Sequence, residues 1–175
     1  MSDNQVIKYS GLLQKLHWLT LVLIIATFAF IEFRGIFPKG TDNRDLMKLC
    51  HFTLGFTLLL LTAIRWFIRR LPNNLAAIQT ITPPIARYAH LCFYFLLITM
   101  PILGWLILSA EGKSLVYFGL ELPRLITENH ELAEVFEETH ELLGKLFYLL
   151  ITVHALAALY HHVIKKDHTL KKMLP

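Results

Sequence analysis

Histidines at matched spacing are the residues of this sequence with the clearest potential for chemistry. His140 and His154 are 14 residues apart, and no side chain between Lys145 and Lys165 carries a formal charge. An α-helix turns about 100° and rises about 1.5 Å per residue, so both imidazoles fall on one face about 21 Å apart. His161 continues the same stripe seven residues further on. A histidine in hydrocarbon is costly and usually faces a partner inside a bundle, so this stripe predicts two stacked sites.

Four apolar stretches must position these histidines. The chain has 175 residues, of which 55% are hydrophobic, and its mean hydropathy is +0.50. Its charge-free windows are residues 16–31, 49–64, 88–110 and 146–164. With flanking residues, each can cross about 30 Å of hydrocarbon. We therefore predict an all-α, integral membrane four-helix bundle of one domain, with spans at about 14–33, 48–68, 85–110 and 140–165.

The charge distribution predicts which ends of the spans face the cytoplasm. If both termini lie inside, the inner segments are basic and contain only Asp3 and Asp167 as acids. The inner basic residues are Lys8, Lys15, Arg65, Arg69, Arg70, Arg87, Lys165, Lys166, Lys171 and Lys172. This bias predicts cytoplasmic termini. The basic charge is then a topology signal, and nothing in the chain resembles a nucleic-acid-binding module.

Sorting the histidines by depth suggests what they bind. His51 and His140 fall at the outer level, and the inner set is His17, His90 and His154, with His161 closest to the inner surface. Paired imidazoles without thiolates or carboxylates suit haem iron, because porphyrin supplies four nitrogens and the protein only two axial ones. Gly55, Gly104 and Gly144 are compatible with making room for the macrocycle. The bundle is therefore predicted to hold two b-type haems.

Two other interpretations of these histidines compete with haem binding. A single intramembrane histidine more often forms hydrogen bonds or relays protons, but four at two matched depths favour two haems. The main alternative is a histidine-lined copper or zinc transporter. Such a protein would normally show additional Cys, Met or acidic ligands, and the spans contain almost none.

The sequence resembles the bacterial cytochrome b561 family of di-haem four-helix membrane proteins, and within it the short chains that act as superoxide oxidases. The resemblance covers nearly the whole chain. It rests on Leu16-His17-Trp18, Glu32-Phe33-Arg34-Gly35 with Phe37-Pro38, His51 before Gly55, His90 followed by Pro101, His140-Glu141 before Gly144, His154-Ala155, His161-His162 before Lys166-Asp167, and Thr169-Leu170 with residues 173–175. Any one of these motifs alone would be weak, and together they are specific.

The resemblance implies a set of cofactors and substrates for particular residues. It implies an outer haem held by His51 and His140, and an inner haem held by His17 and His154. It also implies a place in the bacterial inner membrane. Superoxide would give its electron to the outer haem, and ubiquinone from the quinone pool would be reduced near the inner haem, with His90 and His161 as candidate contacts.

Charge and proton chemistry suggest further roles. An anionic substrate would be attracted by an outer basic cluster, which comprises Arg34, Lys39, Arg44 and Lys48, although the acidic segment 128–141 opposes it. Quinone reduction requires two protons, and an imidazole such as His161 or His90 is a suitable donor. His162, His168 or water could serve instead.

The expected function is therefore a superoxide:quinone oxidoreductase. An alternative is an electron-transfer cytochrome b subunit that docks to a periplasmic dehydrogenase or hydrogenase and passes its electrons to quinone. Both share the two haems, so haem content cannot separate them, whereas activity of the isolated chain can. The metal transporter is separated from both by its cofactor.

Overall fold

Four long helices make up most of the described chain. The computed structural model describes residues 8–72, 74 and 84–174. The helices are α1 (Gly11–Phe33), α2 (Asp42–Arg69), α4 (Pro84–Ala110) and α5 (His130–Val163), and α4 continues through Pro101. All four are long and apolar enough to cross a membrane. The predicted all-α membrane bundle is confirmed.

Short elements mark the two ends of the bundle. The hairpin end carries the 3-10 helix η1 (Arg34–Ile36) and the antiparallel strands β1 (Leu115–Tyr117) and β2 (Leu120–Leu122). The terminal end is the end where α1 begins and the 3-10 helix η2 (Leu170–Lys172) lies. The turn between the strands uses Phe118 and Gly119, with φ of 48° and 84°, as a two-residue hairpin turn requires. This hairpin was not predicted from the sequence.

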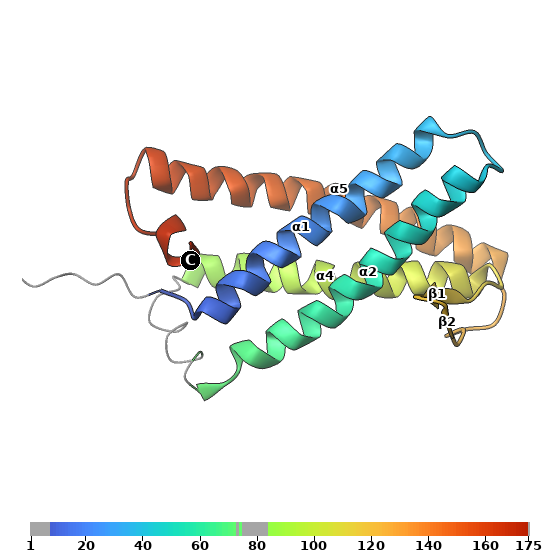
Figure 1. The fold of residues 1–175 in the computed structure, drawn as a ribbon, viewed down its shortest axis with the longest axis horizontal. Coiled ribbons are helices and arrows are strands. Elements are labelled where there is room, and N and C mark those ends of the chain that lie inside the picture. The colour runs from blue at the N-terminus through green and yellow to red at the C-terminus, as the bar shows by residue number, and fades with distance from the viewer. Residues whose placement is uncertain (1–7, 73, 75–83, 175) are drawn as a thin grey trace, which may run out of the picture.

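The helices pack as two antiparallel pairs, α1 with α2 and α4 with α5 (Figure 1). The pairs meet where α2 packs against α4. Within the described residues, no Cα atom of α5 comes within 8 Å of a Cα atom of α1 or α2. The backbone of α5 therefore stands apart from α1 and α2, and side chains span the space between them.

The core lies midway along the bundle. Its buried cluster comprises Ile24, Leu58, Leu96, Leu97, Met100 and Phe147. Phe147 lies seven residues from both His140 and His154, and its ring packs edge-on against Phe28 and Phe93, with ring centres 5.9 and 6.1 Å away. In lipid, helices associate through van der Waals packing of this kind. The core forms an apolar layer between the two ends of the bundle.

Buried threonines are accommodated within the helices themselves. The hydroxyl groups of Thr20, Thr27 and Thr62 donate to the backbone carbonyls of Leu16, Leu23 and Leu58, at 2.6 to 2.7 Å. Each bond runs back four residues along its own helix, so these hydroxyl groups need no partner on another helix.

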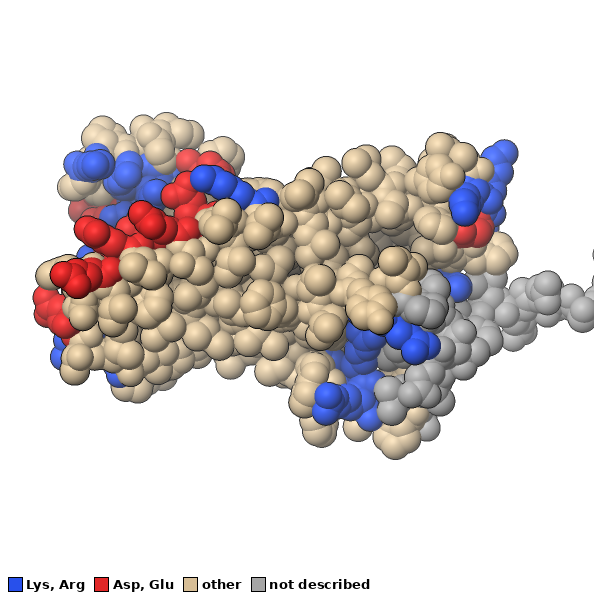
Figure 2. All heavy atoms as spheres, turned by 180° about the vertical axis from the view of Figure 1, so that it is seen from behind, with Lys and Arg blue, Asp and Glu red and all other residues tan. Residues whose placement is uncertain are grey.

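The surface separates an uncharged middle from charged ends. Figure 2 shows tan atoms along the middle of the molecule, with Lys, Arg, Asp and Glu side chains gathered towards the two ends. Large apolar side chains of all four helices are exposed along this middle, including Val22, Leu60, Leu91 and Leu149. In water such a surface would be unfavourable, whereas membrane lipid covers it without cost.

Two helices begin earlier than the spans expected from the sequence. Helix α2 begins at Asp42, where a span was expected from about 48. Helix α5 begins at His130, and the Asn129 side chain caps it by accepting from the Leu132 amide at 3.1 Å. The sequence also predicts an amphipathic extension of this helix from near Thr127, and the helix begins three residues later because the cap is the asparagine. The sequence Thr82-Pro83-Pro84 also suggests a helix start with a threonine cap, and this cap lies outside the described residues.

The C-terminal segment packs against the start of α1. The Gln14 side-chain amide donates to the carbonyls of Lys172 and Leu174 at 3.1 and 3.0 Å, and the Trp18 indole donates to that of Met173 at 3.0 Å. We refer to these contacts as the terminal clasp. The clasp links α1 to the segment that follows α5 at the terminal end.

Candidate functional site

The first histidine pair, which we call the hairpin-end pair, comprises His51 on α2 and His140 on α5. Their ring centres are 6.2 Å apart, and the ring planes are inclined by 73°. The Nδ1 atom of His51 lies 2.9 Å from the carbonyl oxygen of Thr27, which can only accept, so Nδ1 carries the hydrogen. The Nε2 atom of His51 therefore keeps its lone pair for a metal, as is usual for a metal-binding histidine.

Glycines surround the hairpin-end pair. Gly55 and Gly144 each lie four residues after one of the two histidines. A Cβ atom on Gly55 would meet no atom within 4 Å, and one on Gly104 would lie 3.9 Å from His140 Nε2. The absence of side chains here leaves space beside the atom that would bind a metal.

The second pair, the terminal-end pair, comprises His17 on α1 and His154 on α5. Their ring centres are 6.4 Å apart. Trp18 and Phe93 pack edge-on against the two imidazoles, with ring centres 5.6 and 5.0 Å away. The Arg65 guanidinium lies beside this pair, with its Nη2 atom 3.4 Å from His17 Nδ1.

The separation of the rings in both pairs fits one metal ion between two imidazoles. A bond from a metal to an imidazole nitrogen is about 2.0 Å, and the ring centre lies about 1.1 Å behind that nitrogen. Two imidazoles on opposite sides of one ion therefore have ring centres about 6.2 Å apart. In each pair, α5 supplies one histidine and α1 or α2 the other, and these are the helices whose backbones stand apart. The residues fit a planar macrocycle that supplies the remaining ligands to its own iron.

Among the residues that the structure describes, no group of three or more His, Cys, Asp or Glu side chains is arranged to hold a metal ion. A zinc site normally takes four protein ligands, or three with a water. The two histidine pairs instead supply two nitrogens each, which is the number that haem iron requires.

The structure places the other predicted inner residues at the terminal end. His90 on α4 lies within electrostatic reach of His154, Arg65 and Arg69. Its Nδ1 atom and the hydroxyl of Tyr94 are both buried, and neither has a hydrogen-bond partner among the described residues. Two polar atoms one helical turn apart and without partners are consistent with contacts to a bound group.

His161 lies in the last turn of α5 and contacts the segment that follows the helix. Its Nδ1 atom contacts Asp167 Oδ2 at 2.5 Å, and the amide of Thr169 donates to Asp167 Oδ1 at 2.8 Å. These hydrogen bonds hold the pKa of the Asp167 carboxyl well below its usual value. Asp167 therefore stays ionised and orients the His161 imidazole.

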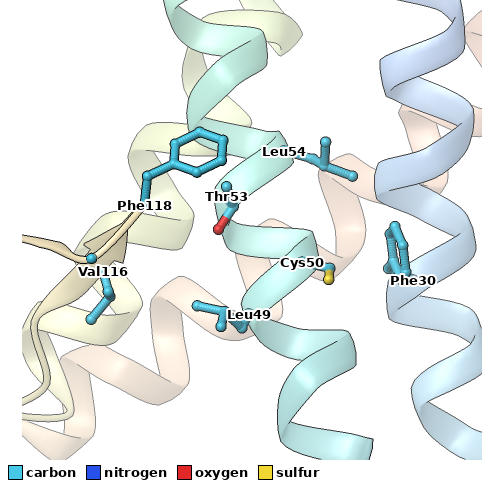
Figure 3. A pocket seen from close by; sticks show the side chains of 8 residues that line it. Phe30, Leu49, Cys50, Thr53, Leu54, Val116 and Phe118 are labelled. Carbon is cyan, nitrogen blue, oxygen red and sulfur yellow. The ribbon is translucent and has the colours of Figure 1, made fainter.

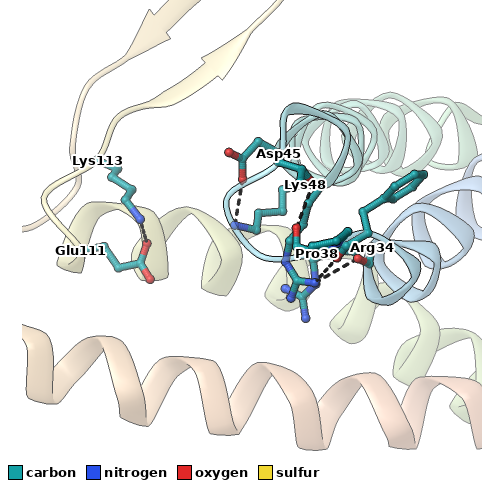
Figure 4. Close-up of polar contacts among 9 residues, drawn as sticks. Arg34, Pro38, Asp45, Lys48, Glu111 and Lys113 are labelled. Carbon is teal, nitrogen blue, oxygen red and sulfur yellow. Dashed lines mark hydrogen bonds and ion pairs between the residues drawn. The ribbon is translucent and has the colours of Figure 1, made fainter.

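The predicted outer basic residues differ in their surroundings (Figure 4). Lys48 forms an ion pair with Asp45 at 3.1 Å. Arg44 donates to the backbone carbonyls of Arg34 and Phe37 at 3.1 and 2.9 Å, so it closes the connection between α1 and α2. Lys39 is exposed, whereas Arg34 is half-buried and within electrostatic reach of His51.

An apolar pocket of about 340 Å³ also opens at the hairpin end (Figure 3). It is lined by Phe30, Leu49, Cys50, Thr53, Leu54, Val116, Phe118 and Gly119, from α1, α2 and the β-hairpin. None of the paired histidines lines it.

From the sequence, Arg65 was assigned only a role as a topology signal. A stronger signal was present, because Arg65 follows His51 by 14 residues, the same step that separates His140 from His154. That step returns to nearly the same helix face. Tyr94 and the Thr27 carbonyl were also missed, and a backbone contact such as the one at Thr27 leaves no signal in side-chain types.

Comparison with known proteins identifies the family to which this chain belongs. Residues 8–175 match the family described as prokaryotic cytochrome b561, and the chain belongs to that family. The protein is therefore a membrane cytochrome b of the kind that binds b-type haem and transfers electrons, as the resemblance predicted.

Individual relatives are similar over almost their whole length. The protein named "Probable superoxide oxidase CybB" of Yersinia pestis is 37% identical over 171 residues, which are 96% of each chain. "Cytochrome b561 homolog 1" of Escherichia coli (strain K12) is 34% identical over 167 residues, covering 91% of this chain and 93% of the relative. "Cytochrome b561 homolog 2" of the same organism is 29% identical over 178 residues.

Proposed function

We propose that residues 1–175 form a single transmembrane domain that holds two b haems. His51 and His140 would hold the outer haem, and His17 and His154 would hold the inner haem. The observation that carries this proposal is the separation of the ring centres, 6.2 and 6.4 Å, in two pairs at opposite ends of one bundle. This spacing agrees with one iron atom between each pair.

We further propose that the terminal end faces the cytoplasm of a bacterium and the hairpin end the periplasm, in the inner membrane. Basic residues next to the membrane are retained on the cytoplasmic side. The terminal end carries Arg65, Arg69 and Arg70 at the end of α2 and Lys165 and Lys166 after α5. The hairpin end carries most of the acidic residues, including Glu128 and Glu131 at the start of α5.

The proposed reaction oxidises periplasmic superoxide to dioxygen and reduces ubiquinone. Two superoxide anions lose one electron each, and one quinone takes up two electrons and two protons to form quinol. Bound haem supplies the one-electron redox chemistry. The similarity to a protein named as a probable superoxide oxidase supports this assignment.

The chain's own residues would attract the anion and supply the protons. Arg34, Lys39 and Lys48 place positive charge at the hairpin end, where an anion would be drawn towards His51 and His140. His161 is the proposed proton donor to quinone, because Asp167 fixes its ring through Nδ1 and leaves Nε2 to exchange a proton. His90, with its unpartnered Nδ1, is a proposed quinone contact at the same end.

The haem assignment is tested by visible spectroscopy of the detergent-purified chain. We expect two b haems per chain by pyridine haemochrome, and one in each of His51→Ala and His154→Ala. The remaining haem should differ in reduction potential between the two variants. A chain that carries no haem despite adequate supply during expression would contradict the proposal and favour metal transport.

The activity is tested with the same protein. Fully haemed protein, without any partner, should reduce a ubiquinone analogue in the presence of a superoxide-generating system, and added superoxide dismutase should stop the reaction. Two intact haems without superoxide-dependent reduction would instead favour the cytochrome b subunit that receives electrons from a periplasmic dehydrogenase or hydrogenase.

A further inference from the structure

Arg65 is a cation without an acidic partner inside the bundle. It is half-buried near the end of α2, within a helix that crosses the membrane. Among the described residues, no carboxylate forms an ion pair with it. A guanidinium is always charged, and a charge at this depth is unfavourable unless an anion or acceptor pairs with it. We therefore expect the Arg65 guanidinium to pair with an anionic group at this position.

The contact between Arg65 and His17 cannot serve as that partner once a metal is bound. Arginine only donates hydrogen bonds, so His17 Nδ1 must accept, and the ring hydrogen then lies on Nε2. A nitrogen that carries a hydrogen has no lone pair for a metal. The distance of 3.4 Å is also long for a hydrogen bond. Binding of iron at His17 Nε2 therefore releases the guanidinium to another acceptor.

Neighbouring groups on α2 and α4 favour the same kind of ligand. The Tyr94 hydroxyl is buried and has no hydrogen-bond partner in the described chain. Tyr94 lies within electrostatic reach of Arg65, and the Arg69 guanidinium lies over its ring, 5.7 Å from the ring centre. Two guanidinium groups and a hydroxyl, to which no acidic side chain of the described residues is paired, suit a ligand with anionic oxygen atoms.

We propose that Arg65 binds a propionate carboxylate of the inner haem, with the Tyr94 hydroxyl as a second donor to the same group. This inference rests on the proposed inner haem at His17 and His154. Haem carries two carboxylates, and arginine pairs with a carboxylate through two parallel hydrogen bonds. The pair keeps the positive charge of Arg65 beside the haem and neutralises the carboxylate within the membrane.

The test compares Arg65→Gln with Arg70→Gln in the purified holoprotein. Arg70 is a suitable control because it lies on the same helix end but stacks on Trp66, with its guanidinium carbon 3.7 Å from the ring centre. Haem content is measured first. The midpoint potentials follow by redox titration, where the inner haem is the one that His154→Ala lacks. The third measurement is the infrared redox difference spectrum of protein whose haem carboxylates carry carbon-13, introduced through labelled 5-aminolevulinate.

In Arg65→Gln we expect two changes confined to the inner haem. The equilibrium constant for its one-electron reduction should fall about tenfold, which corresponds to about 59 mV. The isotope-sensitive carboxylate bands should shift, because the carboxylate loses its partner. Arg70→Gln should leave the potential and the bands unchanged. If Arg65→Gln loses the inner haem, Arg65→Lys should keep it through the retained charge and still shift the bands, because lysine cannot form the paired contact.

Several results would overturn the inference. A lowered potential with unchanged carboxylate bands would mean that Arg65 acts on the iron through its charge alone. An unchanged potential, or equal changes in Arg70→Gln, would also refute it. Absence of an inner haem from the wild-type protein refutes the proposed function instead, so the two failures are distinguishable.

Discussion

The hairpin-end and terminal-end pairs share one geometry and differ in what surrounds them. At the hairpin end, three glycines lie near the imidazoles and a backbone carbonyl orients His51. At the terminal end, no glycine lies within one helical turn of His17 or His154, and a guanidinium contacts His17 instead. The hairpin end thus leaves space beside its histidines, whereas the terminal end places a positive charge beside His17.

This difference indicates how the two proposed haems could have different properties within one bundle. Helix spacing sets the distance between the imidazoles, and it is nearly the same at both ends. The potential of a bis-histidine haem then depends on neighbouring hydrogen bonds, charges and burial. We expect the proposed inner haem, beside Arg65, to be the easier of the two to reduce. Electrons from the periplasmic side would then flow towards the cytoplasmic end.

The largest expected effect comes from removing the space at the hairpin end. In Gly104→Leu, the new side chain would project towards His140 Nε2, 3.9 Å from the Cβ position. It should exclude the outer haem and leave one haem per chain, measured by pyridine haemochrome. Gly11→Leu, where a Cβ meets nothing within 4 Å, is the matched control and should keep both haems. Two haems in Gly104→Leu would contradict the idea that space defines this end.

A smaller effect is expected from charges that surround the hairpin end. Lys48→Gln should lower the rate of superoxide-dependent quinone reduction about twofold at low salt, because it weakens the attraction of the anion. Asp45→Asn should raise the rate, since it removes the carboxylate that pairs with Lys48. Lys165→Gln, at the terminal end, is the control and should have no effect on the superoxide dependence. Persistence of these differences at high salt, where charges are screened, would argue against attraction over distance.

The smallest expected effect concerns acid sensitivity of the terminal end. Hydrogen bonds from His161 and Thr169 lower the pKa of Asp167 in the folded chain, so the folded state binds fewer protons than the unfolded state. The turn is therefore fully stabilised above about pH 4, the ordinary pKa of an aspartate, and loses this contribution as the pH falls further. This contribution is measured as the protection of the Thr169 amide from hydrogen exchange at pH 6 and pH 3, each relative to an unstructured amide at the same pH. In Asp167→Asn the protection should be lower at pH 6 and should change little at pH 3. A variant whose protection still falls with acid would refute the role of Asp167.

Much of the fold follows from the sequence because hydrocarbon imposes simple requirements. Runs of apolar residues gave the four helices, and the 14-residue step between His140 and His154 gave two levels on α5. The structure brings His51 to His140 and His17 to His154, the two pairs that the family resemblance implied. Their role as haem ligands remains a prediction that the variants above test.

Other features could not be read from residue types alone. The β-hairpin depends on two positive φ angles within a short connection, and apolar periodicity carries no signal for them. The start of α5 could be placed only approximately, because Thr127 and Asn129 are both acceptable caps and only the packed structure selects between them. Arg65 was overlooked as a site residue because its value as a topology signal already explained its presence.

The terminal clasp has a consequence for the biosynthesis of the protein. Gln14 and Trp18 bind carbonyls of residues 172–174, which the ribosome adds only after the whole of α5. The hairpin-end pair has both of its histidines once His140 has been made, whereas the terminal-end pair also requires His154, and the clasp forms only after residues 172–174. We therefore expect a haem at the terminal end to be enclosed later in synthesis than one at the hairpin end.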